Sequence, residues 1–141
     1  MAALARREHS RRELERKLDA RGLDRAAVAA VLDDLAGRGL QDDARFAASY
    51  LRSRAEKGFG PRRISAELRE RGVDDATVNT ALAAADTDFA ALACRVRERK
   101  FRTLPRSLPE RAKQTRFLEY RGFESIHIRH ALEQTRDDED F

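Results

Sequence analysis

Apolar positions along the chain form a pattern that repeats every 50 residues. Arg-Gly pairs at 21–22, 71–72 and 121–122 mark the period. The same positions around each pair are apolar in all three copies. These columns are Leu18, Leu68 and Leu118; Leu23, Val73 and Phe123; Val28, Val78 and Ile128; and Leu32, Leu82 and Leu132. A period near 50 is typical of arrays in which similar supersecondary units stack on one another.

Within each copy the apolar spacing predicts helices. Val28, Val31, Leu32 and Leu35 follow the i, i+3, i+4, i+7 pattern of one helix face, and no segment alternates with a period of two. The predicted helices are Ala2–Arg7, Ser10–Arg21, Asp24–Gly37, Asp43–Lys57, Pro61–Arg71, Asp74–Ala84, Asp88–Arg102, Pro109–Arg121 and Ser125–Thr135. We therefore expect an all-α fold of three tandem three-helix repeats, spanning 1–40, 41–86 and 87–136, followed by an acidic disordered tail at 137–141.

Signals for helix ends support these boundaries. The glycine of each Arg-Gly pair lies where a helix C-terminus takes a left-handed residue. The acid two residues further on lies where the next helix takes its N-cap. Ser10 with Glu13, and Ser107 with Glu110, match capping boxes. The two prolines that suit the first position of a helix are Pro61 and Pro109.

The high content of charged residues predicts an elongated protein and not a compact domain, and the excess of basic residues predicts an anionic partner. Charged residues make up 38% of the chain, well above about 25% in an average protein, which leaves a thin core. The net charge is +4, but four acids at 137–140 hide a charge of +8 on the rest. Arginine dominates over lysine, which favours nucleic acid or an acidic protein face as the partner. The alternative is that the arginines reflect a GC-rich genome and a solvated surface.

Several function classes are not supported. The start of the chain has no apolar stretch, and no apolar run approaches the roughly 18 residues that span a bilayer, so we expect a soluble, cytoplasmic protein without membrane contact. The only cysteine, Cys94, lies in an apolar run and is expected to be a buried thiol. His127 and His130 have a spacing that metal sites sometimes use, but no carboxylate completes a site, so a solvated helix face is expected.

The glycine-rich stretch at 58–60 lacks the Lys-Ser/Thr of a phosphate loop, and no serine lies in a nucleophile elbow. We therefore expect no enzyme activity, no catalytic, metal or cofactor-binding residue, and no cofactor.

Basic residues cluster once in each repeat. Arg12 and Arg62 are equivalent under the period of 50, so the clusters would follow one side of a stack, which fits a linear anionic partner. Aromatic residues make up only 6% of the chain, so base stacking is not the expected mode. The clusters are Arg6, Arg7, Arg11, Arg12, Arg16 and Lys17; Arg62, Arg63, Arg69 and Arg71; and Arg95, Arg97, Arg99, Lys100, Arg102 and Arg106.

Four segments in order resemble the signatures of the RecX family. They are Arg7-Glu8-His9-Ser10 with Arg11-Arg12-Glu13-Leu14, Asp42-Asp43-Ala44-Arg45-Phe46-Ala47, Lys57-Gly58-Phe59-Gly60-Pro61 with Ile64, Glu67, Leu68, Arg71 and Gly72, and Arg116-Phe117-Leu118-Glu119-Tyr120-Arg121-Gly122-Phe123. Together they cover nearly the whole chain. The chain departs from the family in two respects. It has Tyr120 where members often carry a second basic residue, and it starts directly at the first motif helix.

The resemblance implies a curved rod of three three-helix repeats that regulates the RecA recombinase negatively. It implies a monomer that binds the groove of the RecA–single-stranded DNA filament, with weak binding to free DNA. Filament extension, ATP hydrolysis, strand exchange and coprotease activity would all fall. The basic residues that we select for filament and DNA contact are Arg7, Arg11, Arg12, Arg16, Arg62, Arg63, Arg69, Arg97, Lys100, Arg116 and Arg121.

Two other functions remain open from the sequence. One is a stand-alone DNA-binding protein, because glycine-turned helix pairs resemble helix-turn-helix units. The other is a scaffold that binds an acidic protein without DNA. An ATPase assay with RecA on single-stranded DNA separates both from the regulator.

Overall fold

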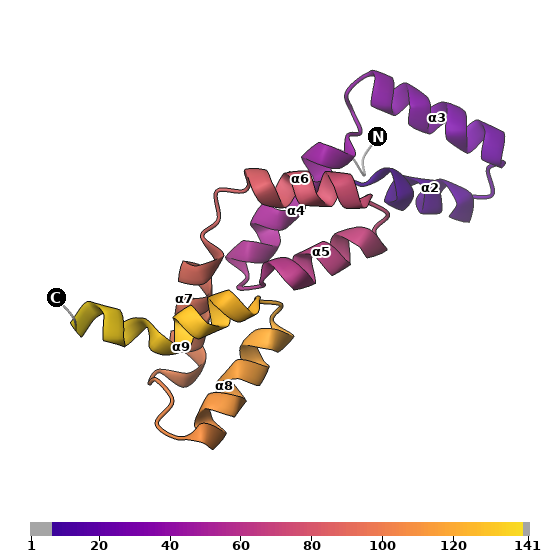
Figure 1. Ribbon diagram of the computed structural model, residues 1–141. Coiled ribbons are helices and arrows are strands. Elements are labelled where there is room, and N and C mark those ends of the chain that lie inside the picture. The colour runs from indigo at the N-terminus through magenta and orange to yellow at the C-terminus, as the bar shows by residue number, and fades with distance from the viewer. Residues whose placement is uncertain (1–6, 140–141) are drawn as a thin grey trace. The chain divides into compact units, whose positions relative to one another are not determined.

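The computed structural model describes residues 7–139, the last six of them by their backbone only. The helices in this range are joined by turns and loops, and the range contains no strand, as the apolar spacing predicts (Figure 1). The predicted helix Ala2–Arg7 falls almost wholly outside the described residues, as do the last two residues of the predicted tail. The helices are α2 (Arg11–Ala20), α3 (Arg25–Gly37), α4 (Asp43–Glu56), α5 (Pro61–Glu70), α6 (Asp75–Ala84), α7 (Phe89–Phe101), α8 (Leu108–Tyr120) and α9 (Ser125–Glu139).

Most of the predicted helix ends are confirmed. The glycines of the three Arg-Gly pairs have φ angles of 82°, 87° and 94° and follow α2, α5 and α8, so each takes the left-handed conformation that glycine adopts without strain. Ser10 and Glu13 form the predicted capping box. Asp24 and Asp74 cap α3 and α6. Pro61 is the first residue of α5.

Two ends differ from the prediction. Glu110 accepts a 2.8 Å hydrogen bond from the backbone of Arg106 instead of Ser107, and α8 begins one residue before Pro109. Ser107 still accepts from the backbone of Glu110 and remains the N-cap. Helix α9 continues past Thr135 to Glu139, since no glycine or proline follows to end it.

The chain divides into two compact units. The first compact unit holds the residues up to Leu51 together with Ala66–Ala85, and the second holds Arg52–Ser65 together with the residues from Asp86 onward. The boundary therefore passes through α4 and α5.

In the first compact unit, α2 packs on α3 around Leu14, Leu18, Val28, Leu32 and Leu35. These side chains include members of the repeated columns, which confirms that the period marks buried positions. Two members of the columns differ: Leu23 remains 45% exposed while its equivalents at 73 and 123 are 3% and 1% exposed, and Leu82 is only half-buried.

In the second compact unit, α7 packs on α8 and α9, and α8 also packs on α9. Its buried side chains include Leu92, Val96, Leu118, Phe123 and Ile128. Cys94 is 3% exposed, as predicted for a buried thiol, and burial raises the pKa of that thiol. This packing fixes the position of α7, the helix that carries Arg95, Arg99 and Lys100.

Candidate functional site

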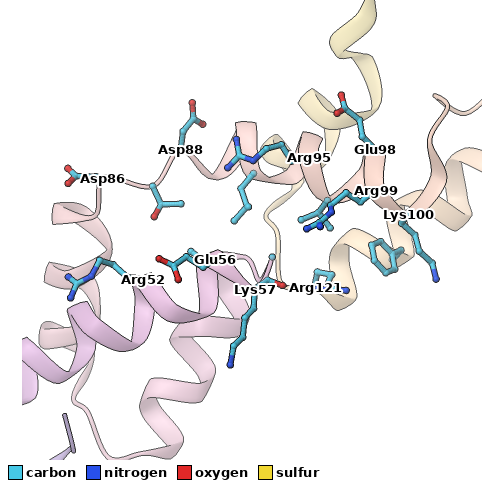
Figure 2. Close-up of a pocket in the computed structure, with 16 residues that line it drawn as sticks. Arg52, Glu56, Lys57, Asp86, Asp88, Arg95, Glu98, Arg99, Lys100 and Arg121 are labelled. Carbon is cyan, nitrogen blue, oxygen red and sulfur yellow. Dashed lines mark hydrogen bonds between the residues drawn. The ribbon is translucent and has the colours of Figure 1, made fainter. Parts of the chain in front are cut away.

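A hollow of about 890 Å³ opens within the second compact unit. Residues from α4, the loop after it, the segment before α7, α7 and α8 line it. Figure 2 shows Arg95 and Arg99 on α7, and Lys57 at the end of α4 with its side chain directed away from α7. The lining residues are Arg52, Ala55, Glu56, Lys57, Gly58, Asp86, Thr87, Asp88, Leu92, Arg95, Val96, Glu98, Arg99, Lys100, Phe117 and Arg121.

The hollow carries an excess of positive charge, with six basic side chains against four acidic ones. Five of the six are exposed: Arg52, Lys57, Arg95, Arg99 and Lys100. Within the described part of the chain, none of these five forms an ion pair, although carboxylates line the same hollow. A concave surface focuses the field of its charges, and guanidinium groups match the geometry of phosphate and carboxylate oxygens. The hollow can therefore hold an anion.

The turn after α4 brings Lys57 to this surface. Gly58 has a φ of 90°, and the amides of Lys57 and Gly58 donate to the carbonyls of Arg54 and Ala55. A Cβ atom at residue 58 would lie 3.1 Å from a methyl carbon of Val96, so the turn sits close against α7. Arg121 reaches back and donates a 3.3 Å hydrogen bond to the carbonyl of Lys57.

Phe117 provides an apolar wall to the hollow. The ammonium of Lys100 lies 5.5 Å from the centre of this ring, and the guanidinium of Arg121 lies 5.2 Å from it. Cation–π contacts of this kind hold the side chains of Lys100 and Arg121 at the rim of the hollow.

A second hollow, of about 590 Å³, lies in the same compact unit and contains Arg62, Arg63 and Tyr120. Arg62 is exposed, and its side chain has no partner among the described residues. Arg63 donates a 3.3 Å hydrogen bond to the carbonyl of Tyr120. The structure thus gathers Lys100 and Arg121 in one hollow and Arg62 and Arg63 in the other.

The predicted contact residues of the first compact unit are largely engaged within the protein. Arg7 pairs with Glu13 at 3.2 Å. Arg11 pairs with Asp33 at 2.8 Å and Arg69 with Asp75 at 2.7 Å. Arg12 packs against Gly72, where an added Cβ atom would lie 2.5 Å from the Cβ of Arg12. Arg16 is exposed and, within residues 7–133, unpaired.

Arg97 differs from the other predicted contact residues because it is only 3% exposed. Its Nε donates a 3.2 Å hydrogen bond to the carbonyl of Ala131, and it lies 3.6 Å from Glu98. Its guanidinium therefore joins α7 to α9, and we leave it out of the proposed interface. Arg116, in contrast, is exposed on α8.

The site list from the sequence omits Arg52, Lys57, Arg95 and Arg99, which the structure brings into the large hollow. The basic run at 95–106 is a visible signal for two of them. No local signal points to Arg52, and Lys57 was visible only as the first residue of the family-like segment 57–61. Both join the hollow through the packing of the turn after α4 on α7.

The first family-like segment, residues 7–14, makes contacts that connect parts of the first compact unit. His9 is 2% exposed; its Nδ1 faces the carbonyl of Arg7 at 3.0 Å and its Nε2 faces the ammonium of Lys17 at 3.1 Å. Nδ1 therefore carries the proton and the ring is neutral. Burial, with the charges of Arg7 and Lys17, lowers the pKa of His9.

The neighbours of His9 connect the first two motifs. Glu8 pairs with Arg45 at 2.8 Å, and the backbone of Arg11 donates to Asp43 at 2.9 Å. Burial opposes the charge of Glu13, but hydrogen bonds from Arg7 and the Ser10 backbone outweigh it and lower the pKa of this carboxyl. The motif thus positions α2 against α4.

Comparison with known proteins decides the family. Models of the first, second and third three-helix domains of RecX match residues 1–35, 42–82 and 86–132. The chain belongs to the RecX family. Its RecX relatives include the regulatory protein RecX of Halorhodospira halophila, 46% identical over 97% of this chain and 86% of that protein, and that of Chromohalobacter salexigens, 46% identical over 92% of this chain and 85% of that protein.

Solved RecX structures share the fold. A crystal structure of a regulatory protein RecX matches with a TM-score of 0.78 and 26% identity, covering 92% of this chain and 66% of that one. RecX from Lactobacillus salivarius matches with a TM-score of 0.77 and 24% identity, covering 94% and 89%. RecX proteins are regulators and not enzymes. Among the residues described for this RecX chain, no group of three or more His, Cys, Asp and Glu side chains could hold a metal ion. The described helices also include none with the length and apolar character of a membrane span.

Proposed function

We propose that this RecX-family regulator of RecA binds in the groove of the RecA–single-stranded DNA filament and inhibits filament extension. ATP hydrolysis, strand exchange and coprotease activity then fall together, because all three need the assembled filament. The protein acts as a monomer in the cytoplasm. The observation that carries the proposal is the large hollow, whose exposed cations are unpaired within the described residues.

The charge of the hollow suits this partner. A single strand held in a filament presents its phosphates along one line, and cations that neutralise phosphates release counterions on binding. Arg95 and Arg99 lie one helical turn apart on α7, so both can face the same anionic surface. The apolar wall at Phe117 adds a surface that a protein partner can cover.

The test compares two variants with the same change in net charge. In the first variant, Arg95→Glu with Arg99→Glu reverses the charge of two residues in the large hollow. In the second, Arg21→Glu with Arg25→Glu reverses the charge of two exposed residues of the first compact unit. The readout is RecA ATPase on single-stranded DNA, with filament binding measured in parallel. We expect the hollow variant to need at least roughly tenfold more protein for half inhibition, and the control to match the parent within about twofold.

Equal inhibition by both variants and the parent would contradict the role of the hollow. Tight binding of the parent to bare DNA with no effect on RecA ATPase would contradict the regulator itself and favour a stand-alone DNA-binding protein.

A further inference from the structure

Tyr120 is an exposed aromatic residue beside basic groups. It is the last residue of α8 and its side chain is 72% exposed. The guanidinium of Arg63 lies over its ring, 5.2 Å from the ring centre, and donates to its carbonyl. One face of the ring is therefore covered by a cation, and the large exposed fraction leaves the rest of the ring open to solvent.

Further contacts hold Arg63 in place. Its guanidinium also lies 4.4 Å from the centre of the half-buried Phe59 ring, which the guanidiniums of Arg54 and Arg121 approach to 3.9 Å and 5.0 Å. Cations and rings thus alternate from Arg54 through Phe59 and Arg63 to Tyr120. Because these contacts fix the covered face of Tyr120, a ligand that stacks on the ring loses less side-chain entropy than it would on a mobile ring.

The second hollow adjoins this ring. Its volume of about 590 Å³ leaves room beside Tyr120, and Arg62 lines the same hollow with an exposed side chain that is unpaired within residues 7–133. Glu119 is the one acid in the lining. An open aromatic ring next to a cation is the pairing that binds a base and its neighbouring phosphate in single-stranded nucleic acid.

We propose that Tyr120 is a stacking platform for one base of single-stranded DNA, and that Arg62 binds an adjacent phosphate. A duplex does not fit this site as well, because its bases are stacked on each other and offer no free face. The low aromatic content of the chain argues against stacking, but a single exposed ring beside a cation is sufficient for one base. The subsite rests on the proposed function only for its choice of DNA, since the filament carries a single strand.

The test uses the full chain with short oligonucleotides at low salt and without RecA. Oligothymidylate carries bases and phosphates, whereas an abasic oligomer of equal length carries phosphates alone. We expect Tyr120→Ala to weaken binding to oligothymidylate by roughly 5- to 150-fold, the range that corresponds to about 1–3 kcal/mol per stacked base. Binding to the abasic oligomer should stay as in the parent, and Tyr120→Phe should keep most of the affinity.

Two further variants separate stacking from other effects. Leu108→Ala removes another exposed apolar side chain of α8, 83% exposed, and should leave both affinities unchanged. Arg62→Glu should weaken binding to both oligomers. Tyr120→Trp supplies the single tryptophan of the chain, whose fluorescence should be quenched by oligothymidylate and not by the abasic oligomer.

The subsite is wrong if Tyr120→Ala binds oligothymidylate as tightly as the parent does. It is also wrong if this variant loses as much affinity for the abasic oligomer as for oligothymidylate, or if the parent binds neither oligomer. Preference of the parent for an acidic peptide over both oligomers would also overturn it. RecA ATPase is measured separately on the same variants. If the parent inhibits RecA ATPase but the stacking test fails, the proposed function stands and the subsite is wrong. If the stacking test succeeds but the parent does not inhibit RecA ATPase, only the subsite stands.

Discussion

The backbone amide of Gly60 donates a 2.8 Å hydrogen bond to the carbonyl oxygen of Arg121 at the end of α8. Fifty residues earlier, the hydroxyl of Ser10 donates a 2.7 Å hydrogen bond to the carbonyl of Arg71 at the end of α5. In both cases the residue before one helix satisfies a carbonyl that the end of another helix leaves open. The period of 50 therefore describes a repeated joint as well as repeated apolar columns.

The close approach of two backbone segments at this joint leaves no room for a side chain at residue 60. A Cβ atom at residue 60 would lie 2.5 Å from the backbone of Gly122 and Phe123, which no side-chain rotation relieves. We expect Gly60→Ala to lower the free energy of unfolding by about 1–3 kcal/mol, measured by urea denaturation followed by circular dichroism. Gly37→Ala is the control, since a Cβ atom there meets nothing within 4 Å and alanine favours the helix. A Gly60→Ala protein as stable as the Gly37→Ala protein would contradict the tight joint.

Ser10 has two roles: its side chain caps α2 and also forms a hydrogen bond to the end of α5. Its Oγ accepts the amide of Glu13 at 3.1 Å and donates to Arg71, and the residue is fully buried. Ser10→Ala should lower the free energy of unfolding by about 2–3 kcal/mol, because it removes the cap of α2 and the hydrogen bond to the carbonyl of Arg71. Ser107→Ala removes an exposed cap of α8 alone and should lower it by about 1 kcal/mol. Equal losses in the two variants would show that the Arg71 hydrogen bond adds nothing.

Stability should fall on the acid side because of His9. The pKa of this buried ring lies below its usual value of 6.5 in the folded protein. Below pH 6.5 the unfolded chain therefore binds more protons than the folded one, and the free energy of unfolding decreases as pH falls through the lowered pKa. Urea denaturation between pH 7.5 and about 5 measures this slope. His9→Asn keeps a donor and cannot titrate, so its slope in this window should be flatter, and an unchanged slope would exclude His9 as the source.

The salt dependence of filament affinity should show whether the cations of the large hollow contact phosphates. Replacing Lys57, Arg95 and Arg99 together by Ala removes three exposed cations without opening the core. If these groups neutralise phosphates of a single strand, the log–log slope of filament affinity against salt should flatten by about 0.7 for each cation removed. Arg21→Ala with Arg25→Ala should leave the slope unchanged. Parallel slopes for the parent and the triple variant would show that the hollow faces no phosphate.

The helices and their ends were determined locally by the sequence. Capping by Ser10 and Asp24 and the turn at Gly22 depend on hydrogen bonds between residues a few positions apart, so neighbouring side chains reveal them. The apolar columns likewise identified much of the core, because a helix buries positions three and four apart. The first family-like segment was also visible in the sequence. Its residues His9 and Ser10 are buried and form hydrogen bonds that connect parts of the fold.

The tertiary structure alone decided which basic residues share a surface. Arg121 and Lys57 are 64 positions apart yet joined by a hydrogen bond, and Arg95 meets them only because α7 packs beside the turn after α4. Arg97 lies in the same basic run as Arg95 but points inward to Ala131. Helical periodicity states which positions share one helix face, whereas the choice between a buried and an exposed face depends on partners far away in sequence.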